Sequence, residues 1–302
     1  MSGRLQFVVF SFNRGRFLEH CVQTLERCAP QCPVLIFDDD SDDPQTRAVL
    51  QRLARRYTVV TPRPLAPGSH GKHGGLYANM QAALDGLDDD VLMCTLQDDM
   101  QLVRSLRDEE IETMAALLER DEGRRFLHHA FLKGAERHRS RVRFVAQDSV
   151  YYAGREQSSA GSHYSDIFIA RVAALRAVNW RFLPREAANE QQARQVFLPM
   201  GHWRDPFAAW LPAATAWRGK KRTWALRRGE KRHRCGFHPL RVMDEEQRRC
   251  FLVRDPAERL PWAEDWLELE KDDLPQPWVY HPLQGSRWLK WLNSVELKLG
   301  NS

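Results

Sequence analysis

The stretch "VLIFDDDSDD", from Val34 to Asp43, decides the fold class of this chain. It sets four apolar residues directly before five aspartates and a serine. A short apolar run without alternation is typical of a strand buried on both faces. Like charges crowded at its end repel one another unless cations or hydrogen-bond donors neutralise them. We therefore expect a buried strand whose carboxyl end holds a polar site.

On both sides of this stretch, apolar runs and amphipathic segments alternate through the first hundred residues. Because the strands are apolar and the helices carry one apolar face, the pattern predicts β-α-β units in a mixed, mostly parallel sheet flanked by helices, an α/β fold. We expect strands at 5–12, 33–37, 57–61 and 90–96, and helices at 16–28, 44–57 and 76–87.

The pattern loosens further along the chain. Helices are expected at 108–120 and 186–197, and a short strand followed by a helix at 165–180. Beyond about residue 212 the chain is rich in Trp, Arg and Pro and has weaker periodicity. The sequence therefore predicts a core domain over 1–212 and a C-terminal extension over 213–302, which contacts an acceptor or a membrane.

Composition and charge narrow the class of protein. The chain has 302 residues, 43% of them hydrophobic, and a net charge of +5, which favours an anionic partner. No apolar run is long enough to span a membrane, and the N-terminus lacks the features of a secretory signal. The six cysteines form no CxxC pair, so we expect reduced thiols and a cytoplasmic protein, peripheral at the inner membrane surface if it contacts lipid.

Two acidic clusters follow predicted strands. Asp38, Asp39 and Asp40 end one strand, and Asp98 and Asp99 end another. Ligands of open parallel sheets bind at the carboxyl ends of strands, so both clusters are expected in one site. Carboxylates there suit a nucleoside diphosphate with Mg²⁺ or Mn²⁺, hard ions that prefer oxygen ligands.

Four motifs in this order resemble those of the GT-A glycosyltransferases, most closely the large family 2. They are "FVVFSFNRGRFLEHCVQTL", "VLIFDDDSDD", "GKHGGLYANMQAAL" and "LMCTLQDDM". The resemblance implies a GT-A Rossmann-like fold and sugar transfer from a nucleotide-sugar donor, UDP-sugar favoured. It covers residues 5–105 well and 160–200 loosely.

The resemblance also implies roles for single residues. Asp38 or Asp39 falls on the contact to base and ribose, and Asp99 on the metal-binding acid, with Asp98 assisting. Gln97 stands where the family has the first acid of Asp-x-Asp, so it adds no charge for a metal. Other expected donor-site residues are Ser11, Asn13, Lys72, Gly74, Gly75 and Asn79.

Inverting transfer needs a general base near the acceptor hydroxyl, commonly a carboxylate. In the family it follows a segment that here resembles "DIFIARVAAL" (166–175). Glu190 is the first candidate, Glu186 the second and Asp166 the third, and each could equally be a solvated or structural acid. His202 is a candidate late metal ligand or phosphate contact, with a structural role as its alternative.

The basic stretch 218–234 holds nine Lys or Arg among seventeen residues. A solvated surface and contact with an anionic acceptor or membrane both fit it. Nucleic acid is less favoured, because no recognised nucleic-acid-binding signature accompanies the charge. The final helix, 286–299, sets Trp288, Leu292, Val295 and Leu299 on one stripe, which indicates core packing or a membrane face.

The sequence lacks the Gly-rich signatures of dinucleotide dehydrogenases and P-loop enzymes. The resemblance described above implies an inverting glycosyltransferase that acts on a glycan or glycolipid acceptor in surface polysaccharide assembly. A catalytically idle GT-A domain that binds nucleotide sugars or acts as a scaffold is the alternative.

Overall fold

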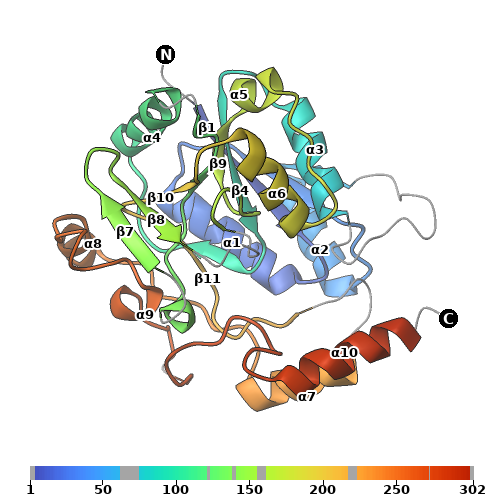
Figure 1. Cartoon of the computed structure of the whole chain (residues 1–302). Coiled ribbons are helices and arrows are strands. Elements are labelled where there is room, and N and C mark those ends of the chain that lie inside the picture. The colour runs from blue at the N-terminus through green and yellow to red at the C-terminus, as the bar shows by residue number, and fades with distance from the viewer. Residues whose placement is uncertain are drawn as a thin grey trace.

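The computed structural model describes residues 4–61, 75–120, 123–137, 141–154, 161–216, 223–271 and 273–299. Its centre is a sheet with the strand order β3-β2-β1-β4-β9-β6-β10-β8-β7 (Figure 1). Those strands are β1 (Arg4–Ser11), β2 (Val34–Asp38), β3 (Thr58–Val60), β4 (Val91–Gln97), β6 (Leu127–His128), β7 (Arg141–Val145), β8 (Val150–Gly154), β9 (Ile169–Arg171) and β10 (Gly201–Trp203).

The first four strands are parallel neighbours, whereas β9 runs antiparallel to both β4 and β6. A hairpin of β7 and β8 closes the far edge through β10. The α/β fold with a mixed, mostly parallel sheet, expected from the sequence, is confirmed.

Helices cover both faces of the sheet. The residues of β1 show why, since Phe7 and Val9 enter one buried cluster while Val8 and Phe10 enter another. Side chains of α1 (Gly15–Cys28), α2 (Pro44–Leu53) and α4 (Asp108–Arg120) complete the first cluster on one face of the sheet. Side chains of α3 (Leu76–Gly86), α5 (Val172–Ala177) and α6 (Glu186–Val196) complete the second on the other face.

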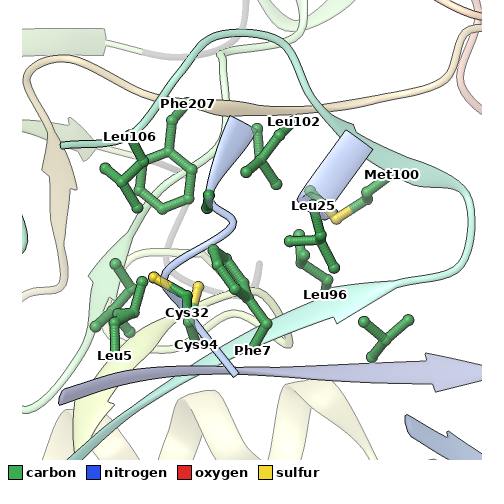
Figure 2. Close-up of a cluster of buried hydrophobic side chains, with 14 of the residues drawn as sticks. Leu5, Phe7, Leu25, Cys32, Cys94, Leu96, Met100, Leu102, Leu106 and Phe207 are labelled. Atoms are coloured by element: carbon green, nitrogen blue, oxygen red, sulfur yellow. The ribbon is translucent and has the colours of Figure 1, made fainter. Parts of the chain in front are cut away.

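Figure 2 shows the first cluster, where Phe7 and Leu96 from the sheet meet Leu25 of α1. Phe207 packs edge-to-face on Phe7, with ring centroids 6.3 Å apart. Cys32 and Cys94 lie in the same cluster as small apolar side chains. This packing fixes β1 and β4 against α1, and so fixes the strand ends that carry the acidic residues.

A separate two-stranded ribbon joins β5 (Met100–Leu102) to β11 (Ala208–Trp210). The chain after residue 212 packs against this ribbon. Gln101 on β5 accepts from the Leu240 N–H at 2.9 Å and donates to its carbonyl at 2.8 Å. Val103 and Ala209 share a buried cluster with Leu240, Phe251 and Trp278. The boundary at residue 212 remains a prediction, and side chains from both sides of it share this cluster.

The C-terminal part contains α7 (Trp224–His233), α8 (Glu245–Leu252), α9 (Ala263–Trp266) and α10 (Arg287–Leu299). A short 3₁₀ turn lies earlier in the chain, at Gly134–Glu136. On α10 the buried residues include Leu289 and Asn293, whereas Trp288 is 57% exposed. The buried side of α10 therefore includes Leu289 and not Trp288, which the sequence placed on the apolar stripe. Leu289 packs with Leu226 of α7 in a small cluster. No helix among the described residues has the length and apolarity needed to cross a membrane.

Candidate functional site

The two acidic clusters end strands on either side of β1. Ser11 pairs in register with Asp38, and Phe10 pairs with Gln97. The Asp39 N–H donates to the Ser11 carbonyl at 2.9 Å, and the Asp98 N–H donates to the Phe10 carbonyl at 3.0 Å. Because the three strands are parallel, both clusters lie at the same edge of the sheet, as expected.

Asp38 and Asn13 hold the loops at this edge. The carboxylate of Asp38 is buried and accepts from the Ser41 N–H at 2.8 Å and from its hydroxyl at 2.6 Å. Asn13, at a φ of 51°, accepts from the N–H groups of Asp42 and Asp43 at 2.9 and 3.0 Å. These bonds use both acceptor positions of the Asn13 amide oxygen and two of the roughly four on the Asp38 carboxylate. Their observed contacts are therefore those of loop-forming residues.

Asp39 faces the start of α3 instead. Its Oδ2 accepts from the Gly75 N–H at 2.7 Å. A Cβ on Gly75 would stand 2.2 Å from Asp39 Oδ1, so the close approach requires glycine. Asn79 is buried in the first turns of α3, where its N–H bonds the Gly75 carbonyl at 2.8 Å. Lys72 and Gly74 lie outside the described residues.

The second cluster is paired with a cation that the chain itself supplies. Arg14, just before α1, forms ion pairs with both Asp98 and Asp99, the latter at 2.7 Å. Asp98 is 1% exposed and also accepts from the Phe12 N–H at 3.0 Å. Burial raises the pKa of Asp98 to about 6, although Arg14 opposes this by favouring the carboxylate. Arg14 therefore compensates the charge crowding at the end of β4.

The side chains at the end of β4 do not form a suitable binding site for a divalent metal ion in this arrangement. Gln97 brings no charge, and both following carboxylates bind the Arg14 guanidinium. No group of three or more His, Cys, Asp or Glu that could hold an ion occurs within the described residues. His202 lies on β10, which β9 and β6 separate from β4 in the sheet.

A pocket of about 230 Å³ lies beside this edge of the sheet. Glu186, the first residue of α6, lines it together with residues from the strands, so α6 points its N-terminal end at the pocket. The His128 and His202 rings pack with their centroids 4.6 Å apart and their planes tilted by 33°, and the Lys133 ammonium lies 3.6 Å from the centroid of the Trp210 ring. Its lining also includes Phe131, Leu132, Glu136, Gly161 and Ser165.

The carboxylate of Glu190, one turn further along α6, is held by hydrogen bonds from backbone N–H groups. Its Oε2 accepts from the N–H groups of residues 161–164 at 2.9 to 3.2 Å, and Arg194 pairs with Oε1 at 2.9 Å. Burial alone would raise the pKa of Glu190, but the His163 and Tyr164 N–H groups and Arg194 outweigh it and lower the pKa. This carboxylate anchors the loop that forms one wall of the pocket.

Asp166 lies behind that wall, in an aromatic setting. It is 8% exposed, and the Tyr77 hydroxyl donates to its Oδ2 at 3.2 Å. Burial raises the pKa of Asp166 well above its usual value, and the charge of Glu186 raises it further, while bonds with Tyr164 and Tyr77 oppose the shift. Burial and the neighbouring charge of Glu186 therefore both favour the protonated form of this carboxyl group.

Sequence reasoning missed several residues of this region. Arg14 was inside the quoted Asn-Arg motif, yet its pairing with acids more than eighty positions away has no sequence period. His128, Lys133 and Trp210 reach the pocket from separate strands and loops. The adjacent histidines in "LHHAF" are the sequence signal that could have pointed to this pocket.

Comparisons with known proteins give likenesses at the level of structure. No protein-family model matches the chain, and no curated protein matches it. TarS of S. aureus, residues 1–349 in complex with UDP, is 15% identical over 68% of this chain and 60% of its own, with a TM-score of 0.43. The mannosyltransferase PcManGT from Pyrobaculum calidifontis, in complex with GDP-Man and Mn²⁺, is 11% identical over 76% of this chain and 61% of its own, with a TM-score of 0.45.

The galactosyltransferase LgtC, in complex with donor and acceptor sugar analogues, is 13% identical over 64% of this chain and 66% of its own, with a TM-score of 0.36. The chain thus spans about 60% of the length of the TarS and PcManGT chains it is compared with. Two of these three structures are named as sugar transferases.

Proposed function

We propose that the chain is a glycosyltransferase that moves a sugar from a nucleotide-diphosphate donor, a UDP-sugar in the first instance, to an acceptor hydroxyl. One observation carries the proposal. Asp39 and Asp98 follow β2 and β4, the two strands that flank β1, so their carboxylates lie at one edge of the sheet, beside a pocket lined by a further carboxylate. An edge of this kind, at the carboxyl ends of parallel strands, suits a nucleotide.

The donor nucleotide is assigned to the side of Asp39 and Ser11. Asp39 is half-buried and can accept hydrogen bonds from a uracil N–H or a ribose hydroxyl. Its bond to the Gly75 N–H holds the carboxylate at the start of α3, where the positive end of the helix dipole favours an anion. The Ser11 hydroxyl is buried, and its oxygen has no hydrogen-bond partner among the residues that the structure describes, so a ligand group could satisfy it.

The chemical step is assigned to Glu186. Of the three candidate bases, Glu190 already accepts four backbone N–H groups, and Asp166 is buried and accepts from the Tyr77 hydroxyl. Glu186 lines the pocket, so it can take the proton of an acceptor hydroxyl placed there. Attack by that hydroxyl from the face opposite the leaving diphosphate inverts the anomeric carbon. No step is routed through a metal ion, because Arg14 holds the two carboxylates that would bind one.

The acceptor is proposed to be a glycan or glycolipid hydroxyl, as in surface polysaccharide assembly. The pocket offers Trp210 as an aromatic wall, with the Lys133 ammonium over its ring and Glu136 nearby. Aromatic faces with flanking hydrogen-bonding groups suit a sugar ring, whose apolar face packs on them. In this proposal residues 213–302 form an extension that supports the acceptor side.

A nucleotide-sugar-binding subunit without transferase activity is the second candidate. The Arg14 ion pairs and the neutral side chain of Gln97 favour this candidate. Both leave the end of β4 without a free acidic pair to bind the metal ion that would neutralise a leaving diphosphate. The two candidates differ in turnover and agree in nucleotide binding.

The test is a thermal-shift panel of nucleotide sugars, followed by a transfer and hydrolysis assay with any that stabilise the protein. We expect a UDP-sugar to raise the Tm of the wild type and to lose this effect in Asp39→Ala. Asp90→Ala is the matched control, because Asp90 is exposed and precedes β4 at the opposite end from Asp99. Binding with no turnover would favour the second candidate, and no stabilisation by any nucleotide would refute both.

A further inference from the structure

The helices α7 and α10 form a pair at the edge of the molecule, apart from the sheet (Figure 1). A small cluster of its own, with Leu226 and Leu289 at its centre, joins them. Glu296 of α10 accepts from the first N–H groups of α7, those of Trp224 and Ala225, at 3.0 and 2.9 Å. The Thr223 hydroxyl donates to Asn293 at 2.7 Å. The pair is therefore a fixed unit with one face turned to solvent.

That outer face carries three exposed indoles. Trp224, Trp288 and Trp291 are 47%, 57% and 61% exposed. Trp224 and Trp288 meet edge-to-face across the two helices, with ring centroids 6.2 Å apart. Single exposed apolar residues are ordinary, but three tryptophans on one helix pair form a patch that calls for a partner.

Basic side chains surround the indoles. On α7 the exposed residues recur at helical spacing from Trp224, which places them on one side of the helix. A pocket of about 440 Å³ brings Arg228, Lys231 and Arg232 of α7 together with Trp288 of α10. The exposed basic residues of the pair are Arg227, Arg228, Lys231, Arg232, Arg287, Lys290 and Lys298.

Both carboxylates of the two helices turn away from this face. Glu230 is buried, and the Ala216 N–H bonds its Oε1 at 3.3 Å. Glu296 is held by the start of α7. In α7 and α10, both of which lie within the described residues, no acidic side chain is left to neutralise the exposed charge.

We propose that the α7–α10 face docks on an anionic phospholipid bilayer, with the indoles at the level of the headgroups and the basic side chains on their phosphates. Tryptophan prefers the boundary between water and acyl chains, because its ring is apolar and its N–H is polar. Lys and Arg on the same face add attraction to anionic lipid. A purely basic face would suit nucleic acid as well, and the three indoles favour the bilayer. The inference is independent of the proposed sugar transfer.

The test is co-sedimentation of the full chain with vesicles of phosphatidylcholine alone or mixed in equal parts with phosphatidylglycerol. We expect binding to the anionic vesicles only, weakening with salt. The double substitution Arg228→Glu/Lys231→Glu should weaken binding to the anionic vesicles at least about tenfold, because it replaces two positive charges with two negative ones. Arg55→Glu/Arg249→Glu is the matched control, because it changes the net charge equally at exposed positions on α8 and after α2.

The indoles are tested separately with brominated lipids, which quench tryptophan fluorescence on contact. Wild-type fluorescence should be quenched, and Trp288→Phe/Trp291→Phe should lose much of the quenching while keeping the wild-type Tm. Equal binding to neutral vesicles, equal loss in the control variant, or displacement by inorganic phosphate would overturn the proposal. So would a short RNA that binds more tightly than the vesicles and depends on the arginines alone.

Discussion

Gly75 and Asp39 meet so closely that no other residue fits at position 75 without moving the carboxylate. The Gly75 N–H donates to Asp39 at 2.7 Å, and a Cβ would stand 2.2 Å from its other oxygen. We expect Gly75→Ala to displace the Asp39 side chain and to lower nucleotide affinity about tenfold, roughly the value of one charge-assisted hydrogen bond. Isothermal titration with UDP measures this.

The control is Gly86→Ala, at the other end of the same helix. A Cβ there meets nothing within 4 Å, so this change should be neutral or stabilise the protein by about 0.5 kcal/mol. Equal affinity in the two variants would show that the contact between Gly75 and Asp39 does not serve the nucleotide.

Arg14→Ala tests the ion pairs at the end of β4. Removing the guanidinium leaves Asp98 buried without its cation, and breaking such a pair costs about 3 kcal/mol. The loss should be largest at neutral pH and should shrink as the pH falls, because a protonated Asp98 needs no partner. Urea unfolding at several pH values measures it. Arg52→Ala, which breaks an exposed pair with Glu19, should cost less than about 1 kcal/mol at every pH.

The same arginine should also limit metal binding at this edge. With Arg14 bound to Asp98 and Asp99, the protein without nucleotide should bind Mn²⁺ weakly. Arg14→Gln removes the competing cation and frees two carboxylates, so Mn²⁺ affinity should rise at least about tenfold. Electron paramagnetic resonance counts the free ion directly. Tight binding in the wild type that Arg14→Gln leaves unchanged would place the ion elsewhere.

The strands and helices of the first hundred residues were predictable because their local patterns agree with their final packing. β1, β2 and β4 are buried on both faces, so each reads as an apolar run. Helix α7 was missed, because its inward-facing residues include few large apolar side chains and the many Lys and Arg residues obscure its hydrophobic periodicity. The ribbon strands β5 and β11 hold three residues each, too few to show any alternation.

The site was predictable only in part, for a physical reason. The acids at strand ends follow from strand positions, which the sequence reveals. Glu186 and Glu190 begin the same helix one turn apart, so the sequence alone could not rank them. Which of them faces the pocket depends on the loop at 161–164, whose N–H groups bond Glu190. Contacts of that kind are set by tertiary structure.

Glu186→Gln and Glu190→Gln separate the two roles. If Glu186 is the base, its amide variant should lower kcat by about a hundredfold or more while the Tm stays near that of the wild type. Glu190→Gln cannot accept four N–H groups as an anion does, so it should lower stability by about 2 kcal/mol. Steady-state kinetics and thermal unfolding give both numbers. A large kcat loss in Glu190→Gln at unchanged stability would reverse the assignment.

Asp166→Asn tests whether the buried carboxyl beside Tyr77 is protonated in the folded protein. The folded state keeps this proton at pH values where the unfolded chain has released it, so the free energy of unfolding falls as the pH rises from about 4 towards the raised pKa. An amide cannot ionise and still accepts from Tyr77. The stability of the variant relative to wild type should therefore rise by at least about 1.4 kcal/mol between about pH 4 and pH 8. Asp90→Asn, at an exposed position, should show no such trend. A constant difference across the range would mean that Asp166 is ionised in the fold, and it would return this residue to the list of candidate bases.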